Sequence, residues 1–265
     1  MVDIRQSIQY ANYLGKIGWT VERVGEINYF VKRLPLVGSI IKLQRPEEIK
    51  IEKIRELAKK YRAFQIIVEP KTELDATYLT SLGFKLSKSP YLPTKTLQID
   101  LTKSKKTLFQ ALAKDAKGAI RKNKNLEIKK SSPENLHLIW KKAVGIKRYV
   151  PPLTHLKVLK KSFKSRSLFV TYKDAGAIFL TSENMAYYWQ AFSGKVARKN
   201  LYQYKILWEG IIWAKGKGAR VFDFEGIFDE RFPKKDWKGF THFKKSFGGY
   251  EISYPGCMLK LRPPF

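Results

Sequence analysis

The sequence predicts a mixed α/β (α+β) fold made of two similar units. A helix, a short apolar strand, a second helix, a glycine and another strand follow one another in the first half of the chain, and the same order returns in the second half. The two apolar strands also end alike, in Glu69-Pro70 and in Glu225-Gly226. Two copies of one unit is the economical interpretation of such a repeat.

The composition is that of a folded protein without disulfides or a zinc cluster. The chain has 265 residues, of which 44% are hydrophobic, enough for one large domain or two small ones. A single cysteine, Cys257, cannot form a disulfide within the chain, and three scattered histidines do not make a Cys/His zinc site. No apolar run is long enough to span a bilayer, and the amino-terminal segment lacks the apolar core of a secretory signal. We therefore expect a cytoplasmic protein.

Periodicity and turn residues predict the elements of the first half. Alternation on both sides of Gly25 favours a hairpin. Acids followed by a basic pair mark the first and last turns of a later helix. The expected elements are helices at 6–16, 47–61 and 74–82, and strands at 19–24, 27–32, 64–68 and 84–87. A linker follows, because Ser89-Pro90-Tyr91-Leu92-Pro93 is the clearest break in the chain.

The second half predicts a meander followed by helix, strand, helix and strand. Its strands are expected at 96–101, 126–129, 168–172, 177–180, 186–191, 221–224, 250–253 and 258–261. Its helices are expected at 104–111, 115–122, 132–144, 156–163, 201–215 and 237–246. This order is typical of an N-acetyltransferase-like acyltransferase unit.

The charge requires a polyanionic partner. The chain has 52 Lys and Arg against 23 Asp and Glu, a formal net charge of +29. Nucleic acid is the leading candidate and anionic lipid the second. The excess is clustered in residues 114–130, which indicates a phosphate-contacting surface on the helix around Arg121. A solvated helix face in a generally lysine-rich protein is the alternative.

Two segments carry candidate chemistry. Asp223 and Glu225 alternate along a buried strand and would share one face. Two acids there favour a site that holds an ammonium or takes a proton from it, or else an ion pair with a nearby cation. Lys244 lies on a short aromatic helix just before Gly248-Gly249. Drawn into a cleft, it would stabilise an oxyanion; otherwise it is a surface lysine.

Other motifs are weaker. Tyr188, Trp189 and the pair Arg148-Tyr149 place aromatic rings beside donors and would bind substrate by stacking, although core packing explains such aromatics equally well. Gly216-Lys217-Gly218 follows a helix and precedes a strand, the wrong order for a phosphate-binding loop. No serine or histidine stands in the context of a covalent nucleophile.

Several motifs, in their order, resemble the FemABX family of aminoacyl-tRNA-dependent peptidyltransferases, which build peptidoglycan cross-bridges. The most specific is the carboxy-terminal signature around Lys244. The segments that carry the resemblance are Gln44-Arg45-Pro46, Leu82-Gly83-Phe84, Ala119-Ile120-Arg121-Lys122, Phe222-Asp223-Phe224-Glu225-Gly226-Ile227 and Phe243-Lys244…Phe247-Gly248-Gly249.

The resemblance implies a fold, a reaction and partners. The fold would be two acetyltransferase-like units, the first reduced: residues 1–93 with about 249–265, then 94–248. The reaction would transfer an amino acid from aminoacyl-tRNA to an amine of a peptidoglycan precursor, UDP-MurNAc-pentapeptide or lipid II. It needs no cofactor and no metal. A lipid-linked acceptor would bring peripheral contact with the inner face of the membrane.

The resemblance also implies residue roles. Lys244, preceded by Phe243, matches the family lysine that stabilises the oxyanion near the tRNA 3′ end, with Asp223 or Glu225 handling the amine unless a substrate phosphate does so. The residues expected to bind tRNA are Lys114, Lys117, Arg121, Lys122 and Lys124. Those expected to bind the precursor are Arg45, Arg148, Tyr149, Tyr188 and Trp189. An acyl-CoA-dependent N-acyltransferase and a non-catalytic RNA-binding protein are the competing hypotheses.

Overall fold

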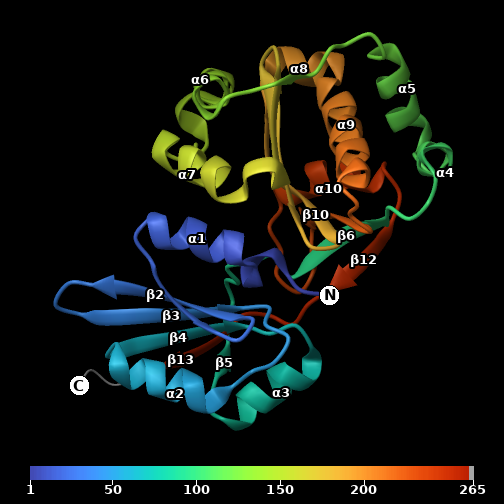
Figure 1. The fold of residues 1–265 in the computed structure, drawn as a ribbon. Coiled ribbons are helices and arrows are strands. Elements are labelled where there is room, and N and C mark those ends of the chain that lie inside the picture. The colour runs from blue at the N-terminus through green and yellow to red at the C-terminus, as the bar shows by residue number, and fades with distance from the viewer. Residues whose placement is uncertain (263–265) are drawn as a thin grey trace. The chain divides into compact units, whose positions relative to one another are not determined.

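The computed structural model describes residues 1–262, with every side chain among them except that of Lys147. It divides into two compact units (Figure 1). Unit 1 comprises Met1–Lys95, Asp229–Lys234 and the chain from Ser253 onward, and unit 2 comprises Thr96–Phe228 and Lys235–Ile252. The chain therefore leaves unit 2 for six residues between Phe228 and Lys235, and it passes finally to unit 1 at Ser253, where the sequence predicted a boundary near residue 249.

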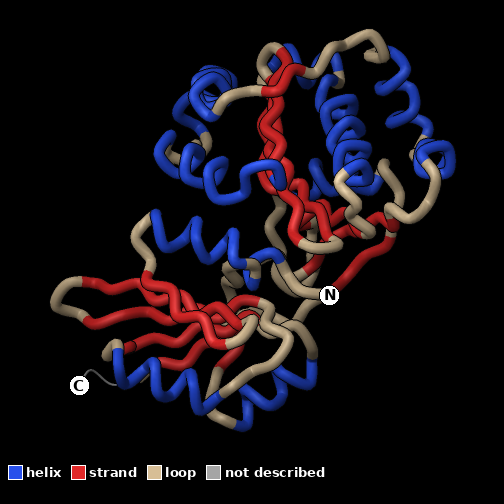
Figure 2. The backbone as a smooth tube through the Cα atoms, in the orientation of Figure 1, coloured by secondary structure: helices blue, strands red, loops and turns tan. Residues whose placement is uncertain are grey.

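Unit 1 is built on a six-stranded mixed sheet with the order β1-β2-β3-β4-β13-β5. Its strands are β1 (Thr20–Val24), β2 (Ile27–Leu34), β3 (Gly38–Gln44), β4 (Ala63–Glu69), β5 (Lys85–Leu86) and β13 (Met258–Leu261). Its helices are the short η1 (Ile4–Gln6), α1 (Ile8–Lys16), α2 (Ile51–Lys60) and α3 (Glu73–Ser81). Helices α2 and α3 cover one face and α1 lies on the other (Figure 2). One hydrophobic core joins the sheet to the helices on the first face, and it includes Val31 and Leu43 from the strands and Ile54, Leu57 and Leu79 from the helices.

Unit 2 has a seven-stranded mixed sheet, in the order β12-β6-β11-β10-β9-β8-β7. The strands are β6 (Lys95–Asp100), β7 (Lys129–Lys130), β8 (Ser167–Tyr172), β9 (Ala175–Ser182), β10 (Met185–Ser193), β11 (Val221–Gly226) and β12 (Tyr250–Ser253). The helices are α4 (Lys105–Gln110), α5 (Lys114–Lys122), α6 (Pro133–Val144), α7 (Leu153–Phe163), α8 (Lys195–Asn200), α9 (Tyr202–Gly216) and α10 (Trp237–Lys245). Helices α6 and α7 lie on one side of the sheet and α9 with α5 on the other (Figure 1).

The two sheets share one plan, so the predicted α/β fold of two similar units is confirmed. Each begins with an antiparallel meander, β1-β2-β3 in unit 1 and β8-β9-β10 in unit 2. A parallel strand follows, β4 or β11. The next position is then filled by a strand from elsewhere in the sequence, β13 in unit 1 and β6 in unit 2, which runs antiparallel to its neighbour.

Several elements differ from the expectations, among them the strand expected at 126–129, which the structure has at Lys129–Lys130. Strand β3 and helix α8 were not predicted, and α2 begins at Ile51 rather than at residue 47. Helix α8 depends on a distant cap, because the Asp174 carboxylate accepts the amide hydrogens of Val196 and Ala197 at 2.9 and 2.8 Å. Helix α2 starts at Ile51, after Lys50, which makes no side-chain hydrogen bond as its N-cap.

Gly249, between α10 and β12, tests this packing. Its φ is +101°, and a Cβ atom there would lie 2.2 Å from the carbonyl oxygen of Gln98 on β6. We expect Gly249→Ala to lower the free energy of unfolding by more than about 2 kcal/mol, since it combines left-handed strain with a backbone clash. The control is Gly239→Ala in α10, where a Cβ meets nothing within 4 Å and about 0.5–1 kcal/mol of stabilisation is expected. Urea unfolding of both variants measures this, and equal effects would contradict the assigned packing.

Candidate active site

The candidate site lies in unit 2, where two parallel strands separate. β10 and β11 pair only from Met185 to Tyr187 with Val221 to Asp223. β10 then continues alongside β9, with a bulge between Tyr188 and Gln190. In unit 1 the equivalent strands β3 and β4 stay paired to their ends, at Gln44 and Glu69. The separation in unit 2 opens backbone groups that the ladder would otherwise satisfy.

Side chains satisfy the backbone at the irregular end of β11. Glu225 has a left-handed backbone, with φ at 59°, and the β11–β6 register slips between Asp223 and Gly226. The Asp223 carboxylate accepts the amide hydrogen of Glu225 at 2.6 Å. The hydroxyl of Thr96 lies between that carboxylate and the Glu225 carbonyl oxygen, so it can donate to either. The Gln98 amide donates to the other carboxylate oxygen at 2.9 Å.

Lys244 is drawn into this site. Its side chain is only 8% exposed, and Nζ donates to the Gly226 carbonyl oxygen at 2.5 Å. The ring of Phe240 lies 5.0 Å from the same nitrogen. Burial lowers the pKa of Lys244 to about 8, against the opposing effects of the Glu225 and Asp223 carboxylates. The ammonium has three donors, and near neutral pH it stays mostly protonated.

The three charged residues predicted for catalysis are therefore brought together, with different environments. Asp223 is buried, and both of its carboxylate oxygens accept hydrogen bonds that fix β11. Glu225 is half-buried and contributes electrostatically at Lys244. Sequence reasoning missed Thr96 and Gln98, which share a face of β6 opposite Asp223. The alternation of Thr96, Gln98 and Asp100 with apolar residues was the available signal.

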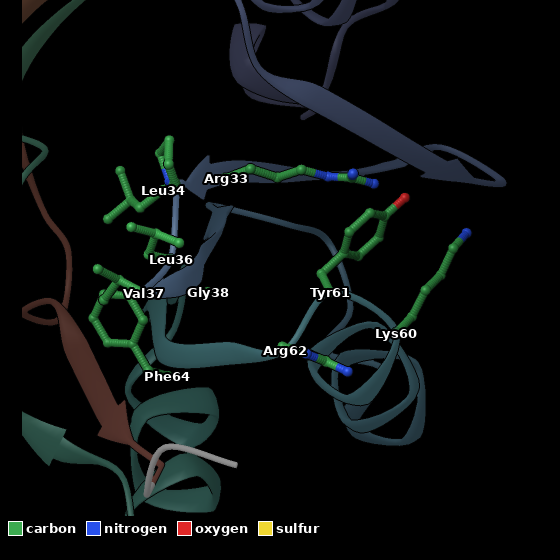
Figure 3. A pocket seen from close by; sticks show the side chains of 10 residues that line it. Arg33, Leu34, Leu36, Val37, Gly38, Lys60, Tyr61, Arg62 and Phe64 are labelled. Atoms are coloured by element: carbon green, nitrogen blue, oxygen red, sulfur yellow. The ribbon is translucent and has the colours of Figure 1, made fainter.

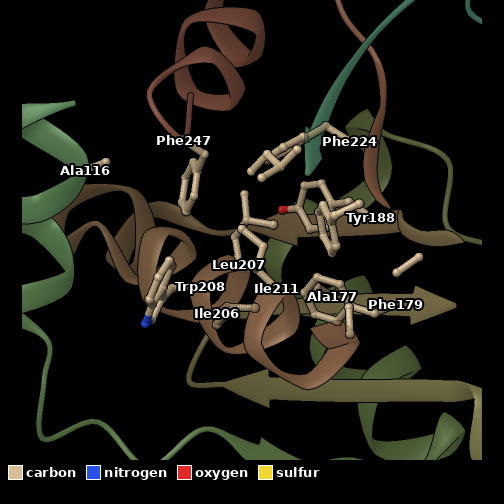
Figure 4. Packing of buried hydrophobic residues seen from close by; sticks show 14 of the residues in the cluster. Ala116, Ala177, Phe179, Tyr188, Ile206, Leu207, Trp208, Ile211, Phe224 and Phe247 are labelled. Atoms are coloured by element: carbon tan, nitrogen blue, oxygen red, sulfur yellow. The ribbon is translucent and has the colours of Figure 1, made fainter. Parts of the chain in front are cut away.

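The predicted aromatic residues divide between core and surface. Phe243 packs against Tyr204 and Phe247, at 4.8 and 5.6 Å between ring centroids. Tyr188 is buried in the same core (Figure 4), and its hydroxyl accepts from the Gln203 amide at 2.6 Å. Burial raises the pKa of that hydroxyl. Trp189, at the bulge of β10, is half-buried.

The predicted basic helix is α5, and it is fastened to the helix that carries Lys244. The amide of Ala113 donates to the Ser246 carbonyl oxygen at 2.8 Å, and His242 of α10 lies 3.8 Å from Asp115 of α5. Of the residues expected to bind tRNA, Lys114, Arg121, Lys122 and Lys124 are exposed. Lys117 is half-buried, and its ammonium donates to the Gln110 carbonyl oxygen at 2.8 Å.

The remaining predicted residues lie elsewhere. Arg148 and Tyr149 are exposed in the connection between α6 and α7. Arg45 belongs to unit 1 and is buried. Its guanidinium contacts Asp3 at 3.2 Å and the Pro93 carbonyl oxygen at 2.6 Å, and it stacks on Tyr254 at 3.7 Å. Arg45, which was expected to bind the precursor, thus makes buried contacts within unit 1.

Among residues 1–262, the structure groups no three His, Cys, Asp or Glu side chains that could hold a metal ion. Within the same residues, no helix combines the length and the apolar character needed to cross a membrane.

Comparison with known proteins identifies the fold. No family model matches the sequence, and no curated protein matches it. FemX superposes with a TM-score of 0.79 at 16% identity, over 98% of this chain and 92% of its own. A domain from Agrobacterium fabrum, named for lysylphosphatidylglycerol synthetase, gives 0.62 at 12% identity, over 97% and 88%. A tandem GNAT protein from the clavulanic acid biosynthesis pathway gives 0.56 at 10%, over 97% and 95%.

These likenesses show that the chain has the fold of FemX, which is also similar to a tandem of two GNAT units. The predicted resemblance to FemABX proteins and the predicted pair of acetyltransferase-like units are confirmed at the level of the fold.

The buried ammonium has a signature in the pH dependence of stability. Below pH 8 Lys244 is protonated in both states. From about pH 8 to 10.5 the unfolded chain still holds the proton that the folded protein has released. The contribution of Lys244 to the free energy of unfolding therefore rises with pH, so that relative to Lys244→Met the wild type gains about 3 kcal/mol across this window. Urea unfolding of both proteins at several pH values measures the difference. Parallel curves would contradict a depressed Lys244 pKa.

Proposed function

We propose that the protein is an aminoacyltransferase of the FemABX type. It would move an amino acid from aminoacyl-tRNA to an amine of a peptidoglycan precursor, UDP-MurNAc-pentapeptide or lipid II. The observation that carries this proposal is the buried Lys244 ammonium at the separated ends of β10 and β11. The FemX fold over nearly the whole chain supports it.

The reaction is the aminolysis of an ester. The acceptor amine forms a bond to the ester carbonyl carbon, and the carbonyl oxygen becomes an oxyanion. The bond to the tRNA 3′ oxygen then breaks, an amide remains, and the proton lost by the amine ends on the released hydroxyl. A fixed ammonium in a water-poor site stabilises such an oxyanion without reorganising. Lys244 would supply it, because its carbonyl partner and Phe240 hold the side chain in place.

The two acids would then have separate tasks. Asp223 holds the end of β11 through the Glu225 amide and the side chains of Thr96 and Gln98. Glu225, which is half-buried beside Lys244, would position the amine or carry its proton. A substrate phosphate could carry the proton instead, in which case Glu225 would be dispensable.

Helix α5 would bind the donor. Its exposed Lys114, Arg121 and Lys122 can neutralise tRNA phosphates, which gives affinity without sequence choice. Its contacts with α10 at Ser246 and His242 link the bound tRNA to the Lys244 helix. The acceptor would meet the exposed pair Arg148-Tyr149 and the half-buried Trp189. With a lipid-linked acceptor, the enzyme would work in the cytoplasm at the inner face of the membrane.

A lipid acceptor other than lipid II is a second candidate. The likeness to the domain named for lysylphosphatidylglycerol synthetase favours it. In that case the acceptor would be a hydroxyl of phosphatidylglycerol, and the product would be an ester rather than an amide. Including this lipid among the acceptors separates the two reactions.

A transfer assay tests the proposal. Purified protein is incubated with radiolabelled aminoacyl-tRNAs and, in parallel, with UDP-linked muramyl pentapeptide, lipid II or phosphatidylglycerol. We expect label to move to a muramyl pentapeptide acceptor. Lys244→Ala should slow the transfer by roughly 10²- to 10³-fold, as the loss of an oxyanion donor does. Acetyl-CoA in place of the charged tRNA should give no acylation.

The matched control is Lys245→Ala, which removes the neighbouring exposed lysine paired with Glu251 at 2.5 Å. It should retain nearly full activity. Circular dichroism and tRNA binding of Lys244→Ala show that the variant is folded and still holds its donor. Undiminished transfer by folded Lys244→Ala, or acylation from acetyl-CoA only, would overturn the proposal.

A further inference from the structure

The turn between β2 and β3 in unit 1 exposes apolar side chains. We call residues 34–37, Leu34-Pro35-Leu36-Val37, the β2–β3 tip. Leu36 is fully exposed and Val37 is 61% exposed. Leu36 also has a left-handed backbone, with φ at 66°. Glycine, asparagine and aspartate are favoured at such turn positions, because other side chains are strained there. Because the Leu36 side chain is exposed, it contributes no apolar burial that would offset the strain of this backbone conformation.

The backbone holds this tip in a fixed position. The amide of Ser39 donates to the Arg62 carbonyl oxygen at 3.2 Å, and the Ser39 hydroxyl donates to the Tyr61 carbonyl oxygen at 2.8 Å. Gly38 lies so close to the start of β4 that a Cβ atom would be 2.4 Å from the Arg62 carbonyl oxygen. The tip is therefore presented by the sheet and has little freedom to bury Leu36 against its own unit.

Cations stand beside the apolar tip. The apolar tip and these cations line one cavity of about 580 Å³. Leu34, Leu36, Val37 and Phe64 gather on one side of it, and Arg33, Tyr61 and Lys60 lie on the other (Figure 3). Arg33 stacks on Tyr61 at 5.1 Å, and Arg62 is exposed at the same cavity. Glu22 pairs with Lys60 at 2.7 Å, and Arg33 and Arg62 add two further cations to the lining of this cavity.

We propose that the β2–β3 tip binds the surface of an anionic lipid bilayer. Leu36 and Val37 would enter the boundary between headgroups and acyl chains, while Arg33, Lys60 and Arg62 would meet the lipid phosphates. An exposed apolar segment flanked by basic residues is the arrangement that binds such surfaces, since apolar burial and attraction to anionic headgroups add. A second copy of the chain is a poor occupant, because a protein of net charge +29 repels itself.

Vesicle sedimentation of the full chain tests this proposal without donor or acceptor. The probe is phosphatidylcholine vesicles with about 30% phosphatidylglycerol, compared with pure phosphatidylcholine. We expect binding to the anionic vesicles that weakens in high salt. Leu36→Asn should reduce the partition coefficient about tenfold or more, and Arg33→Gln about fivefold. Thermal unfolding should show Leu36→Asn as stable as the wild type or more stable, because asparagine tolerates the left-handed turn.

Two control variants make the same kinds of substitution in unit 1 at positions outside the β2–β3 tip. Leu74→Asn removes another exposed leucine, on α3, and Arg55→Gln removes an exposed arginine on α2 that pairs with Glu52; both should bind vesicles as the wild type does. Three results would overturn the proposal: no binding by the wild type, full binding by Leu36→Asn, or a change of oligomeric state in Leu36→Asn. Transfer to a soluble UDP-linked acceptor should be unchanged in Leu36→Asn, so a failure here is distinct from a failure of the proposed reaction.

Discussion

The end of β11 is the constraint on which the rest of unit 2 depends. Once β10 and β11 separate after Tyr187, the backbone groups of residues 225 and 226 lose the ladder that would pair them. Buried peptide groups must find partners, and here a carboxylate, a hydroxyl and an ammonium provide them. Charged groups in a protein interior are expensive. Their presence is explained by the open strand end, whose backbone groups they pair.

Lys244 illustrates how one structural contact can also serve the proposed chemistry. The hydrogen bond to the Gly226 carbonyl oxygen ties α10 to β11, and the hydroxyl of Thr241 makes a second tie by accepting from the Phe228 amide at 2.8 Å. The same hydrogen bond fixes the direction of the ammonium, which has two N–H donors besides the one in this bond. An ordinary surface lysine would have no fixed direction. A lysine held by a strand end is preorganised, which is what oxyanion stabilisation requires.

Local pattern was enough to predict most elements and the order of the repeat, because alternation, helix caps and glycine stops are written in adjacent residues. It was not enough where distant residues decide. Helix α8 begins only because Asp174 caps it from the turn between β8 and β9. Three contacts join distant segments: Lys244 with the Gly226 carbonyl oxygen, Gln98 with Asp223, and Arg45 with Tyr254. Sequence motifs indicated the candidate residues, and the fold was needed to show that the Lys244 ammonium is buried and that the Arg45 guanidinium stacks on Tyr254.

The high positive charge is distributed over distinct surfaces, and two of these surfaces differ in their chemical character. On α5 the cations are carried by a helix whose other face, Ala116, Ala119 and Ile120, is buried, so they form a polar face suited to the phosphates of a long polyanion. At the β2–β3 tip they flank an apolar turn, which tRNA does not need and a lipid surface does. The two surfaces belong to different units and differ in their apolar content. A charge excess spread evenly for solubility would not explain an exposed leucine at a left-handed turn that lines one cavity with Arg33, Lys60 and Arg62, whereas the proposed contact with a lipid surface does.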